Sequence, residues 1–553
     1  MHARPIDDRP RRIERAAYVL LWLLLLTPVL AHGLWRPLVH VFGSAARAPT
    51  MTLAAVVIGA AVAAVQALRP RGSVLLSLSA GCLGAGVATL AGSLGIAGFL
   101  TLLVVAGFAA FLTPRLYAGV PATLDGLAGR HRILCACYVI LALVALVKTT
   151  HLCTFMGDPT RSDLQVLPGE KFMETHSCLS AYVHADKLSR QRVDNLYAEP
   201  LWLGSQGLPE VPAGAENPYR PFLLDYYAYP PPFLLAMTPL APFSGDFAAQ
   251  RALWFGLNGL LLALGLWVVA RWVDGPKAHR ILLLAPLFFG ALPVLATLQV
   301  GNFQIAVVVM TILAMVSFDQ NRSAIGGALL AFAILSKLSP GVFGIVLLLQ
   351  RRYRSAAWTA GFGLLFLAIS VAMAGMNPLH SFLTYTLPRL SSGVTFAFLD
   401  DTPFNIFTNM APFGLPFKFQ LAGMTVHDPW RLARRVSRVY SGVLVLLALV
   451  AARRRAGRRP QAVVWMSLGV LAALQSPFAP GYVTIGLLWA IALMSVEVRS
   501  VLGGFGLLLL WLSLTVVPPT PNLQMYAVFT ILQSAVTLAA PIWLVCRPAP
   551  TSA

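Results

Sequence analysis

Two short stretches place polar side chains inside apolar sequence, where they are positioned to do chemistry. Lys337 interrupts the apolar run Gly326–Val346. An ammonium at membrane depth is costly and usually marks a functional site, here for a lipid phosphate, although a lysine can also extend its amine to the membrane surface. Asn302 and Gln304 lie between two further apolar runs. Their amides either cap helix ends or hydrogen-bond the hydroxyls of a sugar.

A third stretch, DYYAYPPPFLLAMTPLAPF, covers Asp225–Phe243 and joins tyrosines to three consecutive prolines. Proline fixes its own backbone and pushes the preceding residue into an extended form. We therefore expect Tyr229 and the prolines to form a rigid extended strap, with helix only after Pro232. Residues Phe233–Phe243 are too few to span a bilayer. The strap either walls a cavity at the outer leaflet or anchors aromatic side chains at the membrane surface.

The strap closes an acidic segment, residues 151–248, which holds eleven of the chain's 21 acidic residues. A long segment without helical periodicity is usually functional or disordered, and its many aromatic residues argue against disorder. Cys153 and Cys178 both fall in this segment. If the segment faces an oxidising compartment, we expect the two cysteines to form a disulfide.

Apolar helices must position these residues. Of 553 residues, 58% are hydrophobic and only 11% are charged, whereas soluble domains carry about a quarter. Apolar runs of roughly 17–25 residues recur, which is the length of a membrane-spanning helix. The sequence predicts an all-α polytopic membrane protein with 13–16 transmembrane helices. The net charge of +20 reflects arginines in the turns between spans, so no nucleic-acid partner is expected.

The positions of the basic turns predict the topology. They place the N-terminus in the cytoplasm and two segments outside it, residues 151–248 and 375–437. We divide the chain into a four-helix extension (1–131), a core (132–546) and a cytoplasmic tail (547–553). The second outside segment ends in basic residues that oppose the positive-inside rule. Either the predicted topology is wrong at this point, or these residues are held outside for a reason such as binding a phosphate: Arg431, Arg434, Arg435 and Arg438.

Three motifs in order give the chain a family resemblance. They are a Tyr-x-Tyr-Pro-Pro element with a following Pro-Leu-Ala-Pro (Tyr227–Pro242), the turn Gly301–Gln304, and a hairpin with Lys-x-x-Pro and basic residues (Gly327–Arg354). Arg251 follows the first of these motifs, the Tyr-x-Tyr-Pro-Pro element. From about residue 133 to 546 the chain resembles glycosyltransferase family 87 (DUF2029), a group of GT-C type membrane enzymes. The resemblance implies a polyprenyl-phosphate sugar donor bound at the outer leaflet.

The resemblance also implies an acidic base in the first outside segment. The matching stretch is Thr175–Tyr197, in which Tyr182 aligns, but the expected aspartate falls on His176 or Ser177. An acceptor hydroxyl must lose a proton during attack, whereas a phosphate leaving group needs only cationic stabilisation. The open choices are a substitute carboxylate, His176 itself, or a chain that has lost the activity. The substitute carboxylates are Glu174, Asp163 and Asp158.

Together these features predict a hexosyl- or pentosyltransferase of the cytoplasmic membrane with an extracytoplasmic active site. It would transfer sugar from the polyprenyl-phosphate donor to a lipid or glycan acceptor. We expect Tyr182, Tyr227, Tyr229 and Arg251 to help bind substrate with Asn302, Gln304 and Lys337. No cofactor and no metal ligand is expected, with a divalent cation left open. The alternatives are a polytopic transporter or lipid flippase, and a non-catalytic GT-C-like protein of envelope assembly.

Overall fold

The protein is all-helical, as predicted. The computed structural model describes residues 9–43, 47–68, 74–92, 94–118, 132–167, 171–202, 217–273, 278–454, 458–498, 500–517, 520 and 522–547. Within these ranges there is no strand, only an isolated bridge between Asn409 and Pro480. Several predicted features lie outside the described residues: the basic positions Arg69, Arg71 and Arg130, the acidic positions Glu170, Glu210 and Glu216, and most of the cytoplasmic tail.

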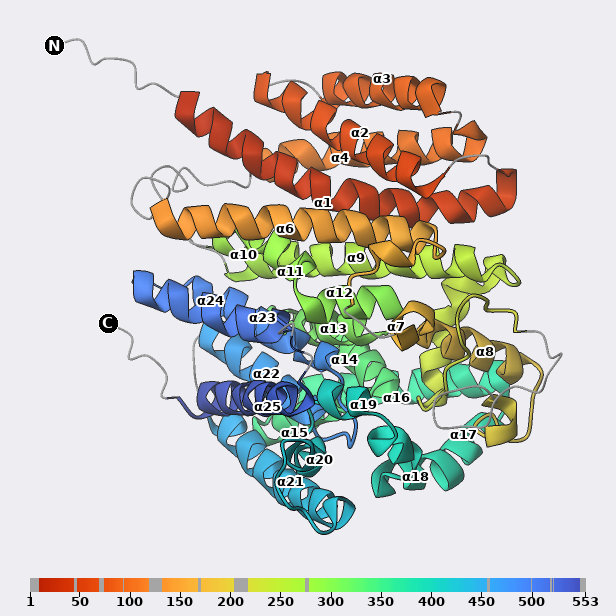
Figure 1. The fold of residues 1–553 in the computed structure, drawn as a ribbon, viewed down its shortest axis with the longest axis vertical. Coiled ribbons are helices and arrows are strands. Elements are labelled where there is room, and N and C mark those ends of the chain that lie inside the picture. The colour runs from red at the N-terminus through yellow and green to blue at the C-terminus, as the bar shows by residue number, and fades with distance from the viewer. Residues whose placement is uncertain are drawn as a thin grey trace. The chain divides into compact units, whose positions relative to one another are not determined.

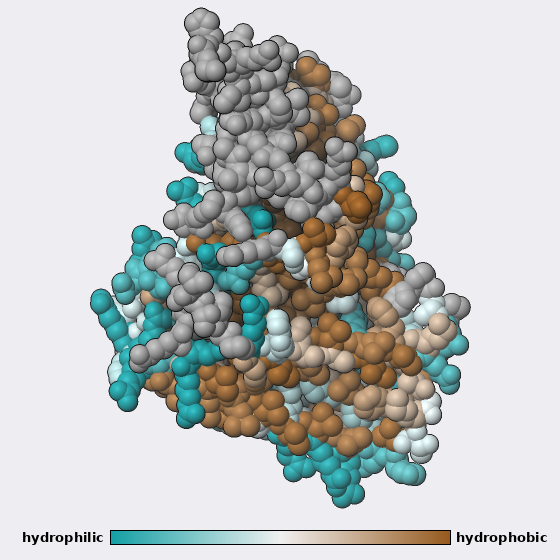
Figure 2. Space-filling model, turned by 90° about the vertical axis from the view of Figure 1, so that its left-hand side faces the viewer, coloured by the Kyte–Doolittle hydropathy of each residue, from teal (hydrophilic) through white to brown (hydrophobic). Residues whose placement is uncertain are grey.

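The chain is a multi-pass membrane protein. Among the described residues, eight helices are long and apolar enough to cross a bilayer, or nine if the bent pair Leu292–Val300 and Gln304–Asp319 is one span. Four further apolar helices have 10–17 residues. The number of long helices is below the predicted 13–16, because several apolar runs fold as short or broken helices. Hydrophobic side chains cover much of the described surface in Figure 2.

The helices belong to two compact units, which we describe separately. Unit 1 comprises residues 1–166, 242–291 and 498–505. Its long helices are α1 (Arg9–Phe42), α2 (Ala48–Leu68), α3 (Val74–Gly92), α4 (Gly95–Ala118), α6 (Arg132–Gly157) and α9 (Phe247–Val273). Its short elements are η2 (Ser162–Leu164), α10 (His279–Leu283) and α11 (Ala285–Phe289). All are labelled in Figure 1 except the 3₁₀ turns.

Within unit 1, the N-terminal helices pack together with α9. Helix α1 packs against α2, α4 and α9. A Cβ added to Gly33 on α1 would meet the Cα of Gly256 on α9 at 2.7 Å, so the two backbones cross in direct contact. Small residues permit such close crossing between membrane helices. The compact unit therefore includes α9 and does not end at the predicted boundary, residue 131.

Helix α6 is longer than predicted, and this changes the expectation for the cysteines. It continues to Gly157, whose carbonyl accepts a hydrogen bond of 2.9 Å from Nε of Arg36. Cys153 is therefore a buried residue of a helix and not part of an outside loop. Cys153 and Cys178 are both free thiols, so the predicted disulfide is not formed. The helix therefore extends into the segment that we expected to begin at residue 151.

Unit 2 comprises residues 167–241, 292–497 and 506–553. Its first elements are α7 (Lys171–Thr175), α8 (Cys178–Arg190), η3 (Glu199–Trp202) and the start of η4 (Pro231–Phe243). The central helices are α12 (Leu292–Val300), α13 (Gln304–Asp319), α14 (Ser323–Ser336), α15 (Gly341–Leu349) and α16 (Tyr353–Ala374). The last ones are α21 (Pro429–Arg453), α22 (Arg458–Ala473), η8 (Gly481–Thr484), α23 (Ile485–Ser495), the end of α24 (Val501–Thr515) and α25 (Leu523–Cys546).

The second predicted outside segment folds as a series of short helices. They are α17 (Asn377–Ser381), η5 (Phe382–Thr386), α18 (Leu387–Ser392), η6 (Val394–Asp400), α19 (Pro403–Thr408), η7 (Pro412–Gly414) and α20 (Leu415–Leu421). Helices α17 and α8 lie at the same end of unit 2 in Figure 1. Here Ser381 donates to the carbonyl of Asp194 at 3.0 Å, which ties the second segment to the first.

Chain breaks in unit 2 fall where the sequence predicted them. Gly301 has φ of +71°, a left-handed conformation that suits glycine, and α12 and α13 meet there at 118°. Helix α14 ends at Lys337, which is extended, and α15 begins after Pro340. Asn302 and Lys337 are thus presented from turns between helices.

The proline strap differs in part from its prediction. Asp225–Tyr229 is irregular, but the 3₁₀-helix η4 begins at Pro231 and includes two of the prolines. Proline is tolerated in a first helical turn because the amide it lacks would be unpaired there. Tyr197 Oη donates to the carbonyl of Tyr229 at 2.9 Å. The strap is therefore held by buried contacts and a short helix.

Candidate active site

One cavity of about 1520 Å³ lies wholly within unit 2. Its lining combines a connected polar group with apolar helix surfaces. The polar lining includes His176, Cys178, Asp225, Tyr229, Asn302, Gln304, Lys337, Arg389 and Tyr482. The apolar lining comes from α15 (Val342, Ile345, Leu349), from α21 (Leu444, Val445, Ala448, Leu449) and from other helices. Such a lining suits an amphipathic ligand with a polar head and an apolar tail.

Asn302 is the centre of the polar group. Its side chain is buried, and its Oδ1 accepts from Nζ of Lys337 at 3.0 Å. Its Nδ2 lies 3.2 Å from Oη of Tyr482 and 3.4 Å from Sγ of Cys178. Both ends of the amide are therefore engaged, which fixes the orientation of Asn302 and links residues from four separate parts of the chain.

Lys337 presents a positive charge to the cavity. Its Nζ donates to Oδ1 of Asn302 and, at 2.8 Å, to Oε1 of Gln304. The same atom lies 5.7 Å from the ring centroid of Tyr229 and 5.3 Å from that of Tyr482. These neighbours orient the ammonium but do not neutralise it, since both amides and both phenols are uncharged partners here. An anion in the cavity would provide that neutralisation.

The strap forms one wall of the cavity. Tyr229 and Pro230 line it directly, while Tyr227 behind them is fully buried. Tyr182 Oη donates to Tyr229 Oη at 3.0 Å, and the Tyr182 ring packs edge-on against that of Tyr229. Tyr197 stacks on Tyr227 from the other side. Rigid aromatic packing therefore places Tyr229 before any ligand arrives, which lowers the ordering cost of binding.

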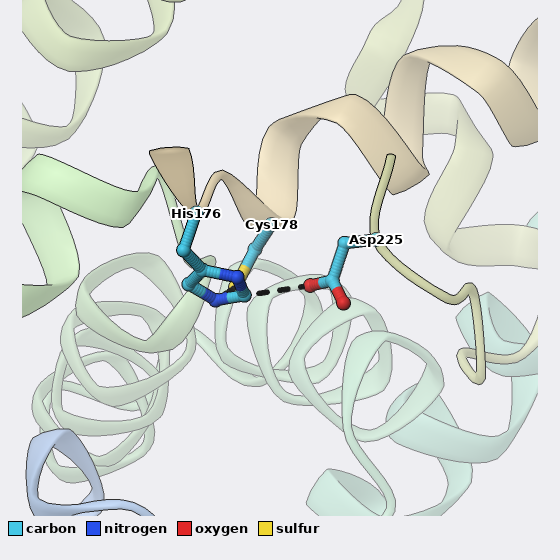
Figure 3. Close-up of side chains that lie close together, drawn as sticks. All are labelled: His176, Cys178 and Asp225. Atoms are coloured by element: carbon cyan, nitrogen blue, oxygen red, sulfur yellow. Dashed lines mark hydrogen bonds and ion pairs between the residues drawn. The ribbon is translucent and has the colours of Figure 1, made fainter. Parts of the chain in front are cut away.

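The cavity also holds side chains that can accept a proton or carry a negative charge. They are His176, Cys178 and Asp225, which point toward one another in Figure 3. His176 precedes α8, Cys178 is the first residue of that helix, and Asp225 begins the strap. Nε2 of His176 lies 3.9 Å from Oδ2 of Asp225 and 3.5 Å from Sγ of Cys178. Burial lowers the pKa of His176 below its ordinary value, and the Asp225 carboxylate opposes that shift. A neutral imidazole beside a carboxylate can accept a proton.

Comparison with protein-family models decides the identity of the region around this cavity. The model of glycosyltransferase family 87 matches residues 227–477. Residues 227–477 belong to glycosyltransferase family 87. This confirms the resemblance seen in the sequence and indicates glycosyltransferase activity, although the match is shorter than the expected 133–546. Neither curated proteins nor solved structures give a match to the chain.

The cavity brings together some predicted site residues from inside and outside the family 87 region. Tyr229, Asn302, Gln304 and Lys337 lie within the matched residues, and His176 lies before them. All five line the cavity. The glycosyltransferase family 87 match thus covers Lys337 and its two amide partners but not His176.

Other predicted site residues do not line the cavity. Asp158 and Asp163 belong to unit 1, where Asp163 is exposed and forms an ion pair of 2.8 Å with Arg161. Arg251 also belongs to unit 1, where its Nη1 donates to the carbonyl of Met156 at 3.4 Å. Glu174 lies on α7 and is absent from the cavity lining. Acidity alone was too weak a criterion, because it did not say which residues turn inward.

Two of the predicted tyrosines support the wall from behind. Tyr182 and Tyr227 are fully buried and do not line the cavity themselves. Their contacts are with Tyr229 and Tyr197. They position the tyrosine that reaches the cavity.

Sequence reasoning missed Asp225 as a site residue. It was counted among the acids of the outside segment, yet it lies two residues before the family 87 match and starts the proline strap. Its backbone N–H donates to Oγ of Ser180 at 3.0 Å, and its Oδ1 accepts from N–H of Tyr226. The sequence feature that could have identified Asp225 is its position at the start of the rigid proline strap, which restricts the direction of its side chain.

Proposed function

We propose that the protein transfers a sugar from a polyprenyl-phosphate donor to a hydroxyl of a lipid or glycan acceptor on the extracytoplasmic side of the membrane. The observation that carries this proposal is the composition of one cavity. It joins a lysine ammonium, a histidine–carboxylate pair and a long apolar lining. A lipid-linked donor needs the ammonium for its phosphate and the apolar lining for its tail. An acceptor hydroxyl needs the histidine–carboxylate pair to accept its proton.

The donor phosphate is assigned to Lys337. Its ammonium already has oriented amide partners in Asn302 and Gln304, so a phosphate oxygen completes its coordination. The lipid tail is assigned to the apolar lining from α15 and α21, where Ile345 and Leu444 face the cavity. Membrane location favours this class of donor, because a polyprenyl chain reaches the cavity from the bilayer.

The acceptor hydroxyl is assigned to the pair of His176 and Asp225. As its oxygen bonds to the anomeric carbon, the bond from that carbon to the phosphate oxygen breaks. The hydroxyl proton passes to the Asp225 carboxylate or the His176 imidazole, and polyprenyl phosphate leaves with its charge stabilised by Lys337. This assignment replaces the expected family aspartate with a carboxylate from the strap, so the chain retains a proton acceptor.

The positions of basic residues support an extracytoplasmic cavity. The turn that carries Lys337 joins α14 and α15, whose other ends lie beside Arg322 and Arg351, and α22, which precedes the turn that carries Tyr482, begins at Arg458. Basic turns mark the cytoplasmic side. The cavity residues therefore belong to the opposite ends of these helices, in agreement with an N-terminus in the cytoplasm.

Sugar transfer by the purified protein tests the proposal. In proteoliposomes, we expect a new glycosidic product from radiolabelled polyprenyl-phosphate hexoses or pentoses with a membrane-lipid extract as acceptor, and none from nucleotide sugars. The transporter alternative predicts movement of the labelled lipid between leaflets without a new glycosidic bond. Transfer from nucleotide sugars alone, or leaflet exchange without product across the donor panel, contradicts the proposed function.

A further inference from the structure

The geometry of His176, Cys178 and Asp225 points to a metal site that the sugar-transfer chemistry does not require. We propose that these three side chains bind a divalent transition-metal ion of the Zn²⁺ type and that the bound ion inhibits transfer. Nε2, Sγ and a carboxylate oxygen of the three residues all lie within 4.8 Å of one another. In Figure 3 the three side chains converge from two separate segments of the chain.

The separations fit one ion. Zinc binds histidine nitrogen at about 2.0–2.1 Å and cysteine sulfur at about 2.3 Å, so two such ligands in a tetrahedral site lie about 3.5 Å apart. Nε2 of His176 and Sγ of Cys178 are 3.5 Å apart. Oδ2 of Asp225 is 3.9 Å from Nε2, and the three ligand atoms all lie within 4.8 Å of one another, so the Asp225 carboxylate must move toward the other two ligands to complete the site. All three residues line the cavity, which leaves water or a ligand in the cavity to supply a fourth ligand.

The surroundings hold the three ligands in place. Nδ2 of Asn302 donates toward Sγ of Cys178 at 3.4 Å. Oδ1 of Asp225 accepts from N–H of Tyr226 at 3.0 Å, which leaves Oδ2 directed at His176. Ser180 Oγ fixes the backbone of Asp225. Hydrogen bonds of this kind orient metal ligands and commonly change metal affinity about 10–100-fold when removed.

The ligand types select the class of ion. Imidazole, thiol and carboxylate together suit zinc and similar transition metals, whereas Mg²⁺ and Ca²⁺ prefer oxygen ligands throughout. Lys337 is linked to Cys178 through Asn302, whose side chain contacts both residues. A thiolate and a carboxylate supply two negative charges against the two positive charges of the ion.

Inhibition rests on the proposed function, whereas metal binding does not. The atoms that would bind the ion are those assigned to the acceptor proton. Coordination uses the lone pair of the His176 nitrogen and lowers the basicity of the Asp225 carboxylate, and the ion fills the space proposed for the acceptor hydroxyl. Transfer should therefore stop when the site is filled and resume when the ion is removed.

Metal binding is tested on EDTA-treated protein in detergent, without sugar substrates. We expect one Zn²⁺ per chain in competition with a fluorescent chelator, and at least about tenfold weaker binding in Cys178→Ser. Co²⁺ should give a thiolate-to-metal charge-transfer band that this variant loses. Cys153→Ser, a buried free cysteine of α6, is the matched control and should bind as the wild type does. Thermal unfolding confirms that each variant is folded.

The outcomes separate binding from function. Equal Zn²⁺ affinity in wild type and Cys178→Ser, or a Co²⁺ spectrum without a thiolate band, overturns the metal site even if the protein is an active transferase. If the site binds Zn²⁺ but the ion stimulates transfer, the inhibitory role is wrong. In proteoliposomes we expect reversible loss of transfer with Zn²⁺, recovery with EDTA, and a smaller loss in Cys178→Ser relative to its own metal-free rate.

Discussion

Replacing Asp225 with asparagine is expected to lower kcat for sugar transfer about 100- to 10,000-fold, the usual contribution of a positioned general base. The amide keeps the size of the side chain but accepts no proton. Binding of polyprenyl phosphate should change little, because the donor phosphate is assigned to Lys337 and not to Asp225. Single-turnover kinetics and donor binding, measured in the same proteoliposomes, separate these two effects.

The control for this variant is Asp186→Asn. Asp186 lies on α8 and forms an ion pair of 2.8 Å with Arg190, a pairing outside the cavity lining. The Asp186→Asn variant should keep the wild-type rate of sugar transfer, since an ion pair at the surface contributes little to stability. If Asp225→Asn retains full activity while Glu174→Gln loses it, the proton acceptor lies on α7 and our assignment is wrong.

The second large effect is expected for Lys337→Met. The variant keeps most of the apolar stem and removes the charge that stabilises the leaving phosphate. We expect kcat/KM for the donor to fall about 100- to 1,000-fold, the usual loss when one oriented donor of this kind is removed. Donor binding should weaken as well, which distinguishes this variant from Asp225→Asn. Initial rates over a range of donor concentrations provide the measurement.

Two further variants make the Lys337 result specific. Lys337→Arg keeps the charge and should recover part of the activity, although the guanidinium fits the two amide partners differently. Lys187→Met removes an exposed lysine of α8 and should behave as wild type. Equal donor kinetics in Lys337→Met and wild type would mean that the ammonium serves only to hold Asn302 and Gln304 in place.

The sequence predicted the elements that carry strong local signals. Membrane helices followed from apolar runs, and the break at Gly301 followed from a polar turn between two of them. Lys337 was singled out because a charge inside an apolar run has few structural explanations. The convergence of Lys337 with Asn302 and Gln304 could be expected because all three fall at the same ends of alternating helices.

Other features depended on contacts that no local pattern reveals. Cys153 and Cys178 share a segment of sequence, but one is packed inside α6 and the other starts α8. Asp225 could not be separated from ten other acids, because its role depends on Ser180 and Tyr226 directing it into the cavity. The position of α9 against α1 depended on the glycine contact between Gly33 and Gly256.

The most direct test of the central claim is an electron cryomicroscopy structure of the protein in nanodiscs with a non-hydrolysable polyprenyl-phosphate sugar. We predict density for the phosphate within hydrogen-bonding distance of Nζ of Lys337, the sugar between Tyr229 and Asp225, and the tail along α15 and α21. Phosphate density elsewhere, for example at the exposed arginines that begin α21, with the cavity empty, would contradict the account.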